Sequence, residues 1–293
     1  MGRRSHLRNL IEYAAARSVL GVLAWTPRPV ANRLARGCAW LLDHVVPRLR
    51  RIALRNLKLA EMDTAIAGGV FQSIARLLVG FARMPRINAS NVGEWIRYEG
   101  YEHYEQALTR GKGVLFATAH LGNWELSAYA HALMSSPMHV VVRPLDNPLI
   151  DTLVSRRRTL SGNRIIEKKD FARAILRALS ANEAVGILVD QNAGLDDGVF
   201  VDFFGIPACA GTGLAKIAAR SGAPLIPGFA VWSESEGRYV LRFYPPVEVT
   251  GDPAADTQRI QAKLESVIRE YPDQWLWIHR RWKTRPPGEE PLY

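Results

Sequence analysis

Cysteine is scarce in this chain: Cys38 and Cys209 are the only two cysteines among its 293 residues. Two isolated cysteines build neither a disulfide framework nor the paired spacing of a zinc site. Their scarcity fits a reducing compartment. We therefore expect the fold to be held by its hydrophobic core, without a structural metal.

A clean hydrophobic run long enough to cross a membrane is also missing. The most apolar N-terminal stretch, residues 10–25, contains Glu12 and Arg17 and is shorter than the roughly 20 residues that a spanning helix needs. No small-residue cleavage site follows a clean apolar core, which argues against a secretory signal. The sequence leaves open whether this region lies on a membrane or spans it once.

The chain contains no G-x-S-x-G nucleophile motif, and neither cysteine has a neighbouring histidine pattern. These absences argue against a covalent acyl-enzyme on serine or cysteine. Zinc-finger, RNA-recognition and basic-zipper patterns are absent too, so the net charge of +10 does not predict nucleic-acid binding. No internal repeat or low-complexity tract is visible.

Positive charge is concentrated at the N-terminal end. Residues 1–58 carry twelve Lys and Arg against Glu12 and Asp43, a net charge of +10 that equals the net charge of the whole chain. Apolar and aromatic residues, among them Trp25 and Trp40, are interleaved with these basic residues. A cationic amphipathic segment favours an anionic membrane surface, where each basic residue contributes roughly 1 kcal/mol. An ordinary helical layer with solvated arginines is the alternative.

After a helical region that ends near Met84, strand-like and helix-like segments alternate. This alternation predicts an α/β fold, a mixed central sheet flanked by helices. We assign residues 1–90 to a basic, helical, membrane-associating region and residues 91–293 to the α/β domain. The expected strands are 113–119, 138–142, 185–189, 225–232 and 239–244, and the expected helices are 124–134, 148–160, 170–179, 212–221 and 255–269.

The most informative stretch is His120-Leu121-Gly122-Asn123-Trp124-Glu125, which follows an apolar strand. We expect His120 to leave the strand, Gly122 and Asn123 to form the turn and helix cap, and Glu125 to lie in the first helical turn. Glu125 would then hold one imidazole nitrogen and leave the other free to take a proton from a substrate hydroxyl. From this pair alone, a structural histidine is the more ordinary interpretation.

Further motifs follow along the chain. They are VRPLDNP at residues 142–148, three arginines at 156–158, VGILVDQ at 185–191, VFVDFFG at 199–205 and WLWIHRRWKTRP at 275–286. In this order, from about Gly100 to Tyr293, they resemble the bacterial lipid A biosynthesis acyltransferases, the lauroyl and myristoyl transferases of the wider lysophospholipid acyltransferase superfamily. Mycobacterial phosphatidylinositol mannoside acyltransferases are similar to this pattern too. The resemblance implies a glycerolipid acyltransferase-like fold.

The resemblance also implies site residues. The H-x4-D/E motif of the family falls on His120 and Glu125, its second-block arginine on Arg158 or a neighbour in the run of three, and its third-block aspartate on Asp190. We expect Asp190 to support the site or position substrate. The predicted substrate-binding residues are Asn123, Arg143, Gln191, Arg280 and Arg281.

Each of these assignments has a structural alternative. For Arg143 it is a salt bridge or a turn contact, and for Asp190 it is a cap or turn role at the strand end. The terminal basic cluster either receives an acidic partner or the acceptor's phosphates, or it locks the C-terminus onto the domain with three tryptophans as core. The cluster comprises His279, Arg280, Arg281, Lys283 and Arg285, and the tryptophans are Trp275, Trp277 and Trp282.

The implied reaction is direct O-acylation of a lipid A precursor by an acyl thioester of acyl carrier protein or CoA, and another glycolipid or a lysophospholipid is the alternative acceptor. His120 acts as general base, and Arg158 with backbone amides near Gly122 stabilises the oxyanion. The implied place is the cytoplasmic face of the bacterial inner membrane, and no metal or bound cofactor is required. A hydrolase using the same dyad and a non-catalytic membrane-binding protein are the alternatives.

Overall fold

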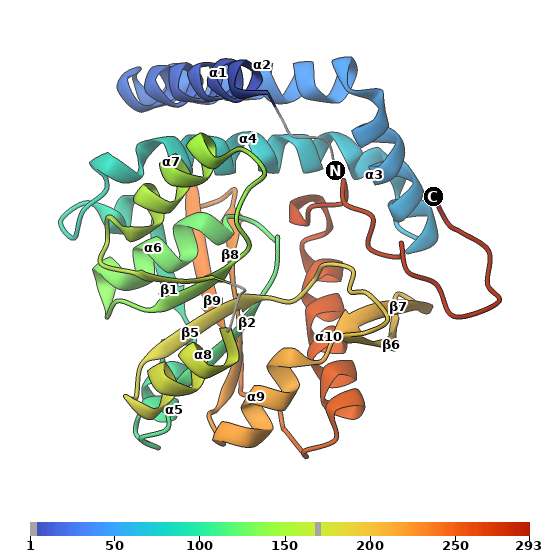
Figure 1. The fold of residues 1–293 in the computed structure, drawn as a ribbon. Helices are drawn as coiled ribbons and strands as arrows, with labels where there is room; N and C mark the ends of the chain where they lie inside the picture. The colour runs from blue at the N-terminus through green and yellow to red at the C-terminus, as the bar shows by residue number, and fades with distance from the viewer. Residues whose placement is uncertain (1–4, 168–170) are drawn as a thin grey trace.

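The computed structural model describes residues 5–167 and 171–293, and its centre is a seven-stranded sheet with the strand order β1-β9-β8-β2-β5-β3-β4 (Figure 1). The β8–β9 pair is antiparallel and the other pairs are parallel, so the sheet is mixed, as predicted. The sheet strands are β1 (Ile96–Glu99), β2 (Val114–Thr118), β3 (His139–Val142), β4 (Arg164–Glu167), β5 (Ala184–Leu188), β8 (Leu225–Ser233) and β9 (Arg238–Phe243).

Helices cover both faces of this sheet. The first three are α1 (His6–Trp25), α2 (Arg28–Val45) and α3 (Pro47–Leu59), followed by the 3-10 turn η1 (Thr64–Ile66). The others are α4 (Ala67–Arg83), α5 (Tyr101–Leu108), α6 (Trp124–Met134), α7 (Pro148–Thr159), α8 (Phe171–Ser180), α9 (Gly213–Ser221) and α10 (Pro253–Glu270). Further 3-10 turns are η2 (Met84–Arg86), η3 (Val92–Glu94) and η4 (Pro272–Gln274).

Strand β2 illustrates why this sheet is buried on both faces. Its side chains alternate between the faces, as the strand period requires. Val114 and Phe116 join the core cluster that includes buried residues of α4, α5 and α6. Leu115 and Ala117 join the opposite cluster, which includes buried residues of α8, α9 and α10. A strand without a solvent side reads as a continuous apolar run, which is the pattern that identified it.

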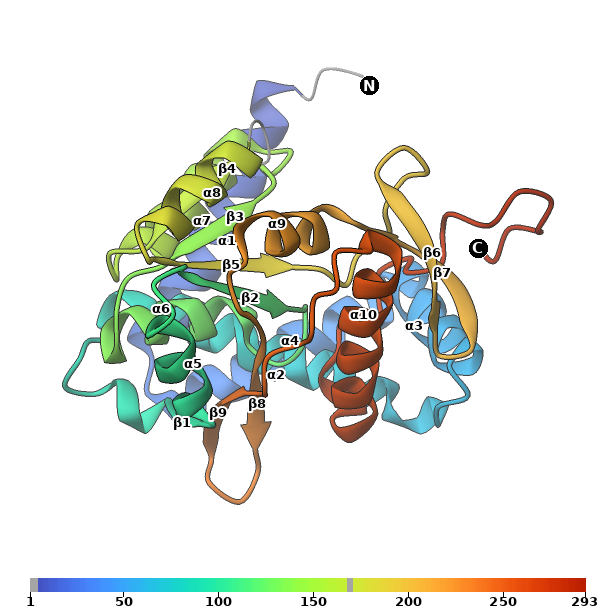
Figure 2. The same cartoon turned by 90° about the horizontal axis from the view of Figure 1, so that it is seen from below.

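The predicted elements of the α/β region are confirmed with boundary shifts of one or two residues, and the helical region before Met84 is confirmed as well. Residue 170, the expected start of one helix, lies outside the described residues. Strands β1 and β4 and helix α5 were not predicted. A separate hairpin of β6 (Gly198–Phe203) and β7 (Ile206–Gly211), which Figure 2 shows beside α10, was not predicted either, because its VFVDFFG stretch was interpreted only as a motif.

The N-terminal helices form a layer at one side of the molecule, with α4 between them and the sheet (Figure 1). Most exposed large hydrophobic side chains of the described residues belong to this layer. On α1 and α2 they are Leu7, Leu10, Ile11, Val19, Val22, Trp25, Val30, Leu34, Trp40, Leu41 and Val45. The predicted amphipathic segment therefore presents an apolar outer surface.

One described segment, Thr64–Arg86, has the length and apolar composition of a membrane-spanning helix. This corrects the expectation that no stretch qualifies. Half of its apolar window is buried, and α4 packs against α1, α2 and α6, as a core helix does. Arg83 within it donates to the carbonyl oxygens of Leu23 and Thr26, which ties α4 to the end of α1.

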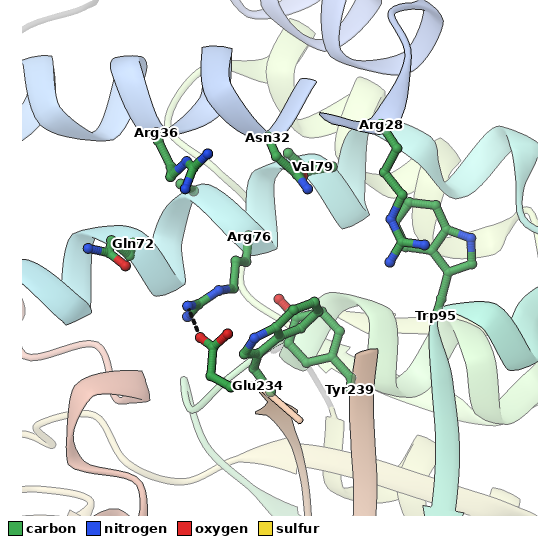
Figure 3. Close-up of a pocket in the computed structure, with 11 residues that line it drawn as sticks. Arg28, Asn32, Arg36, Gln72, Arg76, Val79, Trp95, Glu234 and Tyr239 are labelled. Atoms are coloured by element: carbon green, nitrogen blue, oxygen red, sulfur yellow. Dashed lines mark hydrogen bonds and ion pairs between the residues drawn. The ribbon is translucent and has the colours of Figure 1, made fainter. Parts of the chain in front are cut away.

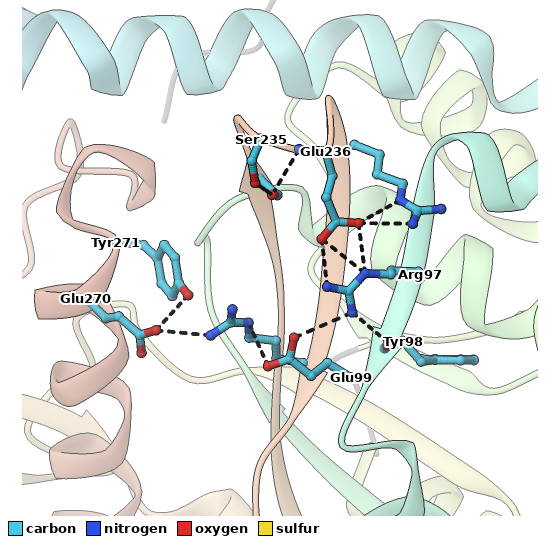
Figure 4. A network of polar contacts seen from close by, with 10 residues as sticks. Arg97, Tyr98, Glu99, Ser235, Glu236, Glu270 and Tyr271 are labelled. Atoms are coloured by element: carbon cyan, nitrogen blue, oxygen red, sulfur yellow. Dashed lines mark hydrogen bonds and ion pairs between the residues drawn. The ribbon is translucent and has the colours of Figure 1, made fainter.

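The outer edge of the sheet is tied by a polar network across β1, β9 and the β8–β9 turn (Figure 4). Arg97 of β1 binds Glu236 in the turn, with Nη2 and Oε1 2.6 Å apart, and Arg238 binds the same carboxylate at 3.0 Å. Exposed ion pairs of this kind contribute little stability individually. Their effect here is to fix the β8–β9 turn, which projects from the sheet in Figure 2.

Candidate active site

His120 and Asp190 leave two neighbouring strands at the same edge of the sheet. Strands β2 and β5 are parallel, and Thr118 pairs with Leu188 in their register. His120 and Asp190 each lie two residues beyond that pair, so the register brings them together. Reactive side chains in α/β sheets gather at this carboxyl edge.

The Asp190 carboxylate is fully buried and accepts three hydrogen bonds. One oxygen accepts from His120 Nδ1 at 2.8 Å. The other accepts from the His120 backbone N–H and from the indole Nε1 of Trp275, both at 2.9 Å. This arrangement fixes both the ring and the main chain of His120, and it assigns the imidazole proton to Nδ1. The Nε2 atom makes no hydrogen bond within the described part of the chain.

The two groups shift each other's titration. Burial alone lowers the pKa of the His120 imidazole, but the charge and hydrogen bond of Asp190 outweigh burial and raise this pKa above its ordinary value of 6.5. Burial alone raises the pKa of the Asp190 carboxyl, yet His120 holds it well below its usual range. Asp190 thus stays ionised and favours protonation of His120, as the acid of a Ser-His-Asp triad does.

Glu125 forms a second pair beside the first. It lies in the first turn of α6, and Arg158 of α7 binds it with two parallel hydrogen bonds, Nε to Oε2 at 2.8 Å and Nη2 to Oε1 at 2.5 Å. The side chains are only 12% and 19% exposed, respectively. Two-pronged charge-assisted pairs of this geometry are strong and orient both partners.

The expected His120–Glu125 hydrogen bond is therefore wrong: Asp190 takes the place predicted for Glu125. The physical reason is that Asp190 leaves the strand next to β2, whereas Glu125 starts a helix and faces α7. Glu125 still acts on His120 through space, since its charge raises the pKa of the imidazole.

The three consecutive arginines have different environments. Arg158 reaches Glu125, Arg157 donates to the carbonyl oxygens of Phe81 and Ala82, and Arg156 is exposed. The structure thus distinguishes Arg158 as the arginine of the site. Its Nη1 atom makes no hydrogen bond within the described residues and is available to a substrate.

The turn after His120 requires glycine at position 122. Gly122 has a φ of +62°, and a Cβ atom there would lie 1.9 Å from the carbonyl oxygen of Ala230. The Gly122 N–H donates to the Gln274 carbonyl oxygen, and the Asn123 N–H donates to Ala230. Because both amides are already bonded, the expectation that amides near Gly122 help to bind the oxyanion is wrong for these two.

The C-terminal segment binds His120 and Asp190 from behind, which the sequence did not predict. Trp275 donates to Asp190, the Leu276 N–H donates to the His120 carbonyl oxygen at 2.9 Å, and His279 Nε2 lies 3.3 Å from the Asp190 carbonyl oxygen. The WLWIHRRW block was the available signal. Trp275, Trp277 and Trp282 are fully buried, so the structural alternative for these residues is confirmed.

Arg281 was assigned to substrate or partner binding, and the structure corrects this. It is fully buried, donates to the Cys209 carbonyl oxygen at 2.8 Å and to Gln261 at 3.2 Å, and stacks on Phe203. Burial lowers its pKa to about 10. Arg281 therefore fixes the C-terminal segment and cannot contact a substrate.

The remaining predicted binding residues are placed as follows. Asn123 is fully buried, and its side-chain oxygen caps α6 by accepting from the Leu126 N–H. Arg143 after β3 and Gln191 after Asp190 are exposed near the same sheet edge, and Arg280 is half-buried beside Tyr293. Their contacts with substrate stay predictions, and for Asn123 only an indirect effect through α6 is compatible with its burial.

Comparison with known proteins identifies the family. A sequence profile of the bacterial lipid A biosynthesis acyltransferases matches residues 1–284. The chain belongs to this family. It is 30% identical over 287 residues to the lipid A biosynthesis lauroyltransferase of Escherichia coli K12, covering 94% of this chain and 92% of that protein. The palmitoleoyltransferase of the same strain is 31% identical with the same coverage.

A more distant relative is the phosphatidylinositol mannoside acyltransferase of Mycobacterium tuberculosis H37Rv, 27% identical over 290 residues, which cover 96% of this chain and 91% of that protein. As a member of the lipid A biosynthesis acyltransferase family, the protein is an acyltransferase. The family match extends through α1–α4, so the N-terminal layer belongs to the family region as much as the sheet does.

Proposed function

We propose that this protein transfers a fatty acyl chain from an acyl carrier protein thioester to a hydroxyl of a lipid A precursor, with His120 as general base. The observation that carries this proposal is the His120–Asp190 pair. Asp190 fixes Nδ1 as a donor, so the neutral imidazole presents the lone pair of Nε2 to a substrate hydroxyl. The attacking hydroxyl comes from the acceptor, so no protein nucleophile is needed.

In this reaction the acyl group passes directly from the thioester sulfur to the acceptor oxygen, without a covalent enzyme intermediate. His120 Nε2 takes the proton as the acceptor oxygen bonds to the thioester carbon, and the imidazolium that forms is stabilised by Asp190. The tetrahedral intermediate expels the thiolate when the carbon–sulfur bond breaks. His120 then returns its proton to the sulfur, which releases the thiol and the ester and regenerates the base.

Arg158 is the donor we assign to the oxyanion. Its Nε and Nη2 atoms are bound to Glu125, which holds the guanidinium plane in place, and Nη1 remains for the developing negative charge. An oxyanion donor fixed in advance is worth about 10²–10³ in rate. Glu125 thus serves as the anchor of Arg158 in this proposal.

We place the reaction at a membrane, with the exposed apolar side chains of α1 and α2 against the lipid. Trp25 is 78% exposed and Trp40 is 61% exposed. Exposing large aromatic side chains to this extent is energetically unfavourable on a surface that faces water. Aromatic side chains with interleaved basic residues suit a membrane interface. The cytoplasmic face of the bacterial inner membrane is the compartment that an acyl carrier protein donor implies.

The test is product mass spectrometry after incubation with acyl carrier protein thioesters, or the CoA thioester, and a Kdo-bearing tetra-acylated lipid A precursor. A mass gain of one acyl chain, absent with His120→Ala, supports the proposal. Free fatty acid without acylated lipid would indicate a hydrolase. Acylation of a phosphatidylinositol mannoside instead would change the acceptor and keep the chemistry.

The pH dependence of the reaction follows from the raised pKa of His120. Only neutral His120 accepts a proton, so the rate is lost as pH falls through this pKa. We expect kcat/KM to rise with pH through a midpoint above the ordinary histidine value of 6.5. A pH series of initial rates measures it, and a midpoint below 6.5 would contradict the pairing of His120 with Asp190.

Substituting Arg158 by lysine tests the anchored arginine. Lysine keeps the charge but cannot make two parallel bonds to Glu125 while also offering a third donor. We expect kcat to fall about 10²-fold, the effect of displacing a catalytic group by about 1 Å. The matched control is Arg156→Lys, an exposed neighbour on the same helix, which should stay near wild type. Equal effects of both changes would argue against the assignment.

A further inference from the structure

A cleft lies between the N-terminal helix layer and the β8–β9 hairpin, apart from the catalytic pair (Figure 3). Its volume is about 200 Å³. Residues from α2 and α4 form its roof, residues of β8, β9 and the β8–β9 turn form its floor, and Trp95 before β1 closes one side. The lining polar residues are Arg28, Asn32, Arg36, Gln72, Arg76 and Glu234.

Three arginines line this cleft with a single carboxylate, a net charge of +2. Arg28 stacks on Trp95 with its guanidinium carbon 4.4 Å from the ring centre, and Arg76 stacks on Trp232 at 5.3 Å. These contacts hold two guanidinium groups at the cleft walls. Their planar forks suit the oxygen atoms of a phosphate group.

Arg36 differs from the other two cleft arginines because no described residue pairs with it. It makes no ion pair or hydrogen bond with any residue that the structure describes, and Figure 3 shows its guanidinium pointing from α2 toward the cleft. The single acid, Glu234, binds Arg76 but is 75% exposed, so an incoming anion can displace it at little cost. The cleft therefore holds more positive charge than its own acids neutralise.

The walls also carry neutral donors. Asn32 and Gln72 add side-chain amides. The indole Nε1 of Trp232 is buried and has no hydrogen-bond partner within the described residues. The cleft thus offers donors and no strong acceptor other than Glu234.

Size and charge together define the ligand. The cleft, with a volume of about 200 Å³, has room for a phosphorylated headgroup. A phosphomonoester carries about −1.5 to −2 charges near pH 7, which matches the net charge of the lining. A carboxylate would leave much of that positive charge unpaired.

The position of the cleft indicates where this phosphate comes from. Arg28, Asn32 and Arg36 are four residues apart on α2 and share one face, whereas the exposed Val30, Leu34 and Leu41 share the opposite face. When that apolar face lies on a bilayer, the cleft is one helix diameter, about 10 Å, from the plane where α2 touches the membrane. That depth corresponds to the outer edge of the headgroup region.

We propose that this cleft binds a phosphomonoester at the tip of a membrane lipid headgroup. The site holds the protein on membranes that contain such a lipid, in addition to the general attraction between its basic N-terminal helices and anionic lipid. The network of Arg97, Arg238 and Glu236 fixes the hairpin turn that carries one wall, and Arg28 donates to the Gly237 carbonyl oxygen in the same turn. The membrane placement rests on the proposed function, but binding in the cleft does not require acyl transfer.

The test uses phosphatidylcholine vesicles that contain phosphatidylinositol 4-phosphate, compared with vesicles containing phosphatidylserine at the same surface potential. We expect tighter binding to the phosphomonoester lipid, and at least a tenfold weakening of that binding in Arg36→Gln. The matched control is Arg33→Gln, which removes the same charge from an exposed position of α2 outside the cleft. It should weaken binding to both vesicles slightly and equally, and both variants should keep the wild-type Tm.

Glucose 6-phosphate separates a lipid headgroup from a soluble phosphate. Its competition with vesicle binding, with no effect of glucose, would support a phosphate site. Its binding without any vesicle preference would overturn the lipid assignment, and equal losses in Arg36→Gln and Arg33→Gln would overturn the site. His120→Ala should bind vesicles like wild type, so failure of the acyl-transfer proposal leaves this result unchanged.

Discussion

Replacing His120 by alanine is expected to reduce kcat/KM of acyl transfer by about 10²–10⁴-fold, the typical value of a positioned general base. The acceptor hydroxyl is a weak nucleophile until its proton is removed. His120 Nε2 is the atom that removes it, because Nδ1 is committed to Asp190. Steady-state rates with a purified thioester and acceptor measure the loss.

The chain offers a closely matched control for this substitution. His139 also pairs with a carboxylate, Glu183, at 2.7 Å, and its side chain is 14% exposed against 15% for His120. It begins β3, at the end of the strand opposite to the carboxyl edge. His139→Ala therefore removes the same group with similar burial and should keep near-normal rates. Rates within a few fold of wild type for His120→Ala would exclude His120 as the base.

The sequence predicted which edge of the sheet carries the site, but not which carboxylate pairs with His120 there. An apolar strand followed by a histidine, a glycine turn and a capped helix is a local pattern, and it correctly predicted where His120, Asn123 and Glu125 lie. The partner of His120 depends on which strand lies beside β2. That neighbour is β5, about seventy residues away, and its register with β2 is a property of the folded sheet.

Arg281 shows a second limit. A run of basic residues near the C-terminus normally predicts a solvated surface, because arginine is almost never fully buried. Here the backbone of the C-terminal segment lies behind the catalytic edge, and the carbonyl oxygen of Cys209 and the side-chain oxygen of Gln261 accept from two of the three guanidinium nitrogens. Such compensation depends on three distant segments, and composition does not reveal it.

Two ion pairs with different tasks then explain the motif spacing. In the proposed reaction, the pair of Asp190 and His120 controls the proton, and the pair of Glu125 and Arg158 stabilises the charge on the substrate. The carboxylate of the H-x4-E motif thus contributes by anchoring an arginine. Substitutions of Asp190 should alter the pH profile most, because Asp190 is the larger cause of the raised pKa of His120, whereas Arg158→Lys keeps the charge and should lower kcat at all pH values.

Replacing Asp190 by asparagine is expected to lower kcat by about 10⁴-fold, as the equivalent change does in Ser-His-Asp enzymes. Three N–H donors face the carboxylate, and two of them share one oxygen. The asparagine oxygen would accept from the His120 backbone and Trp275, so its NH₂ group would face Nδ1 of the ring. That donor selects the tautomer with a proton on Nε2, which can no longer accept one from the substrate.

Asp256→Asn is the control, since Asp256 is equally a buried aspartate that accepts several bonds, from Thr250, Gly251 and Arg259. Both variants should lose thermal stability, but only Asp190→Asn should lose activity out of proportion to its Tm. Loss of the negative charge also removes the cause that raises the pKa of His120, so any residual rate should show a lower pH midpoint. An unchanged midpoint would mean that the activity depends on a base other than His120.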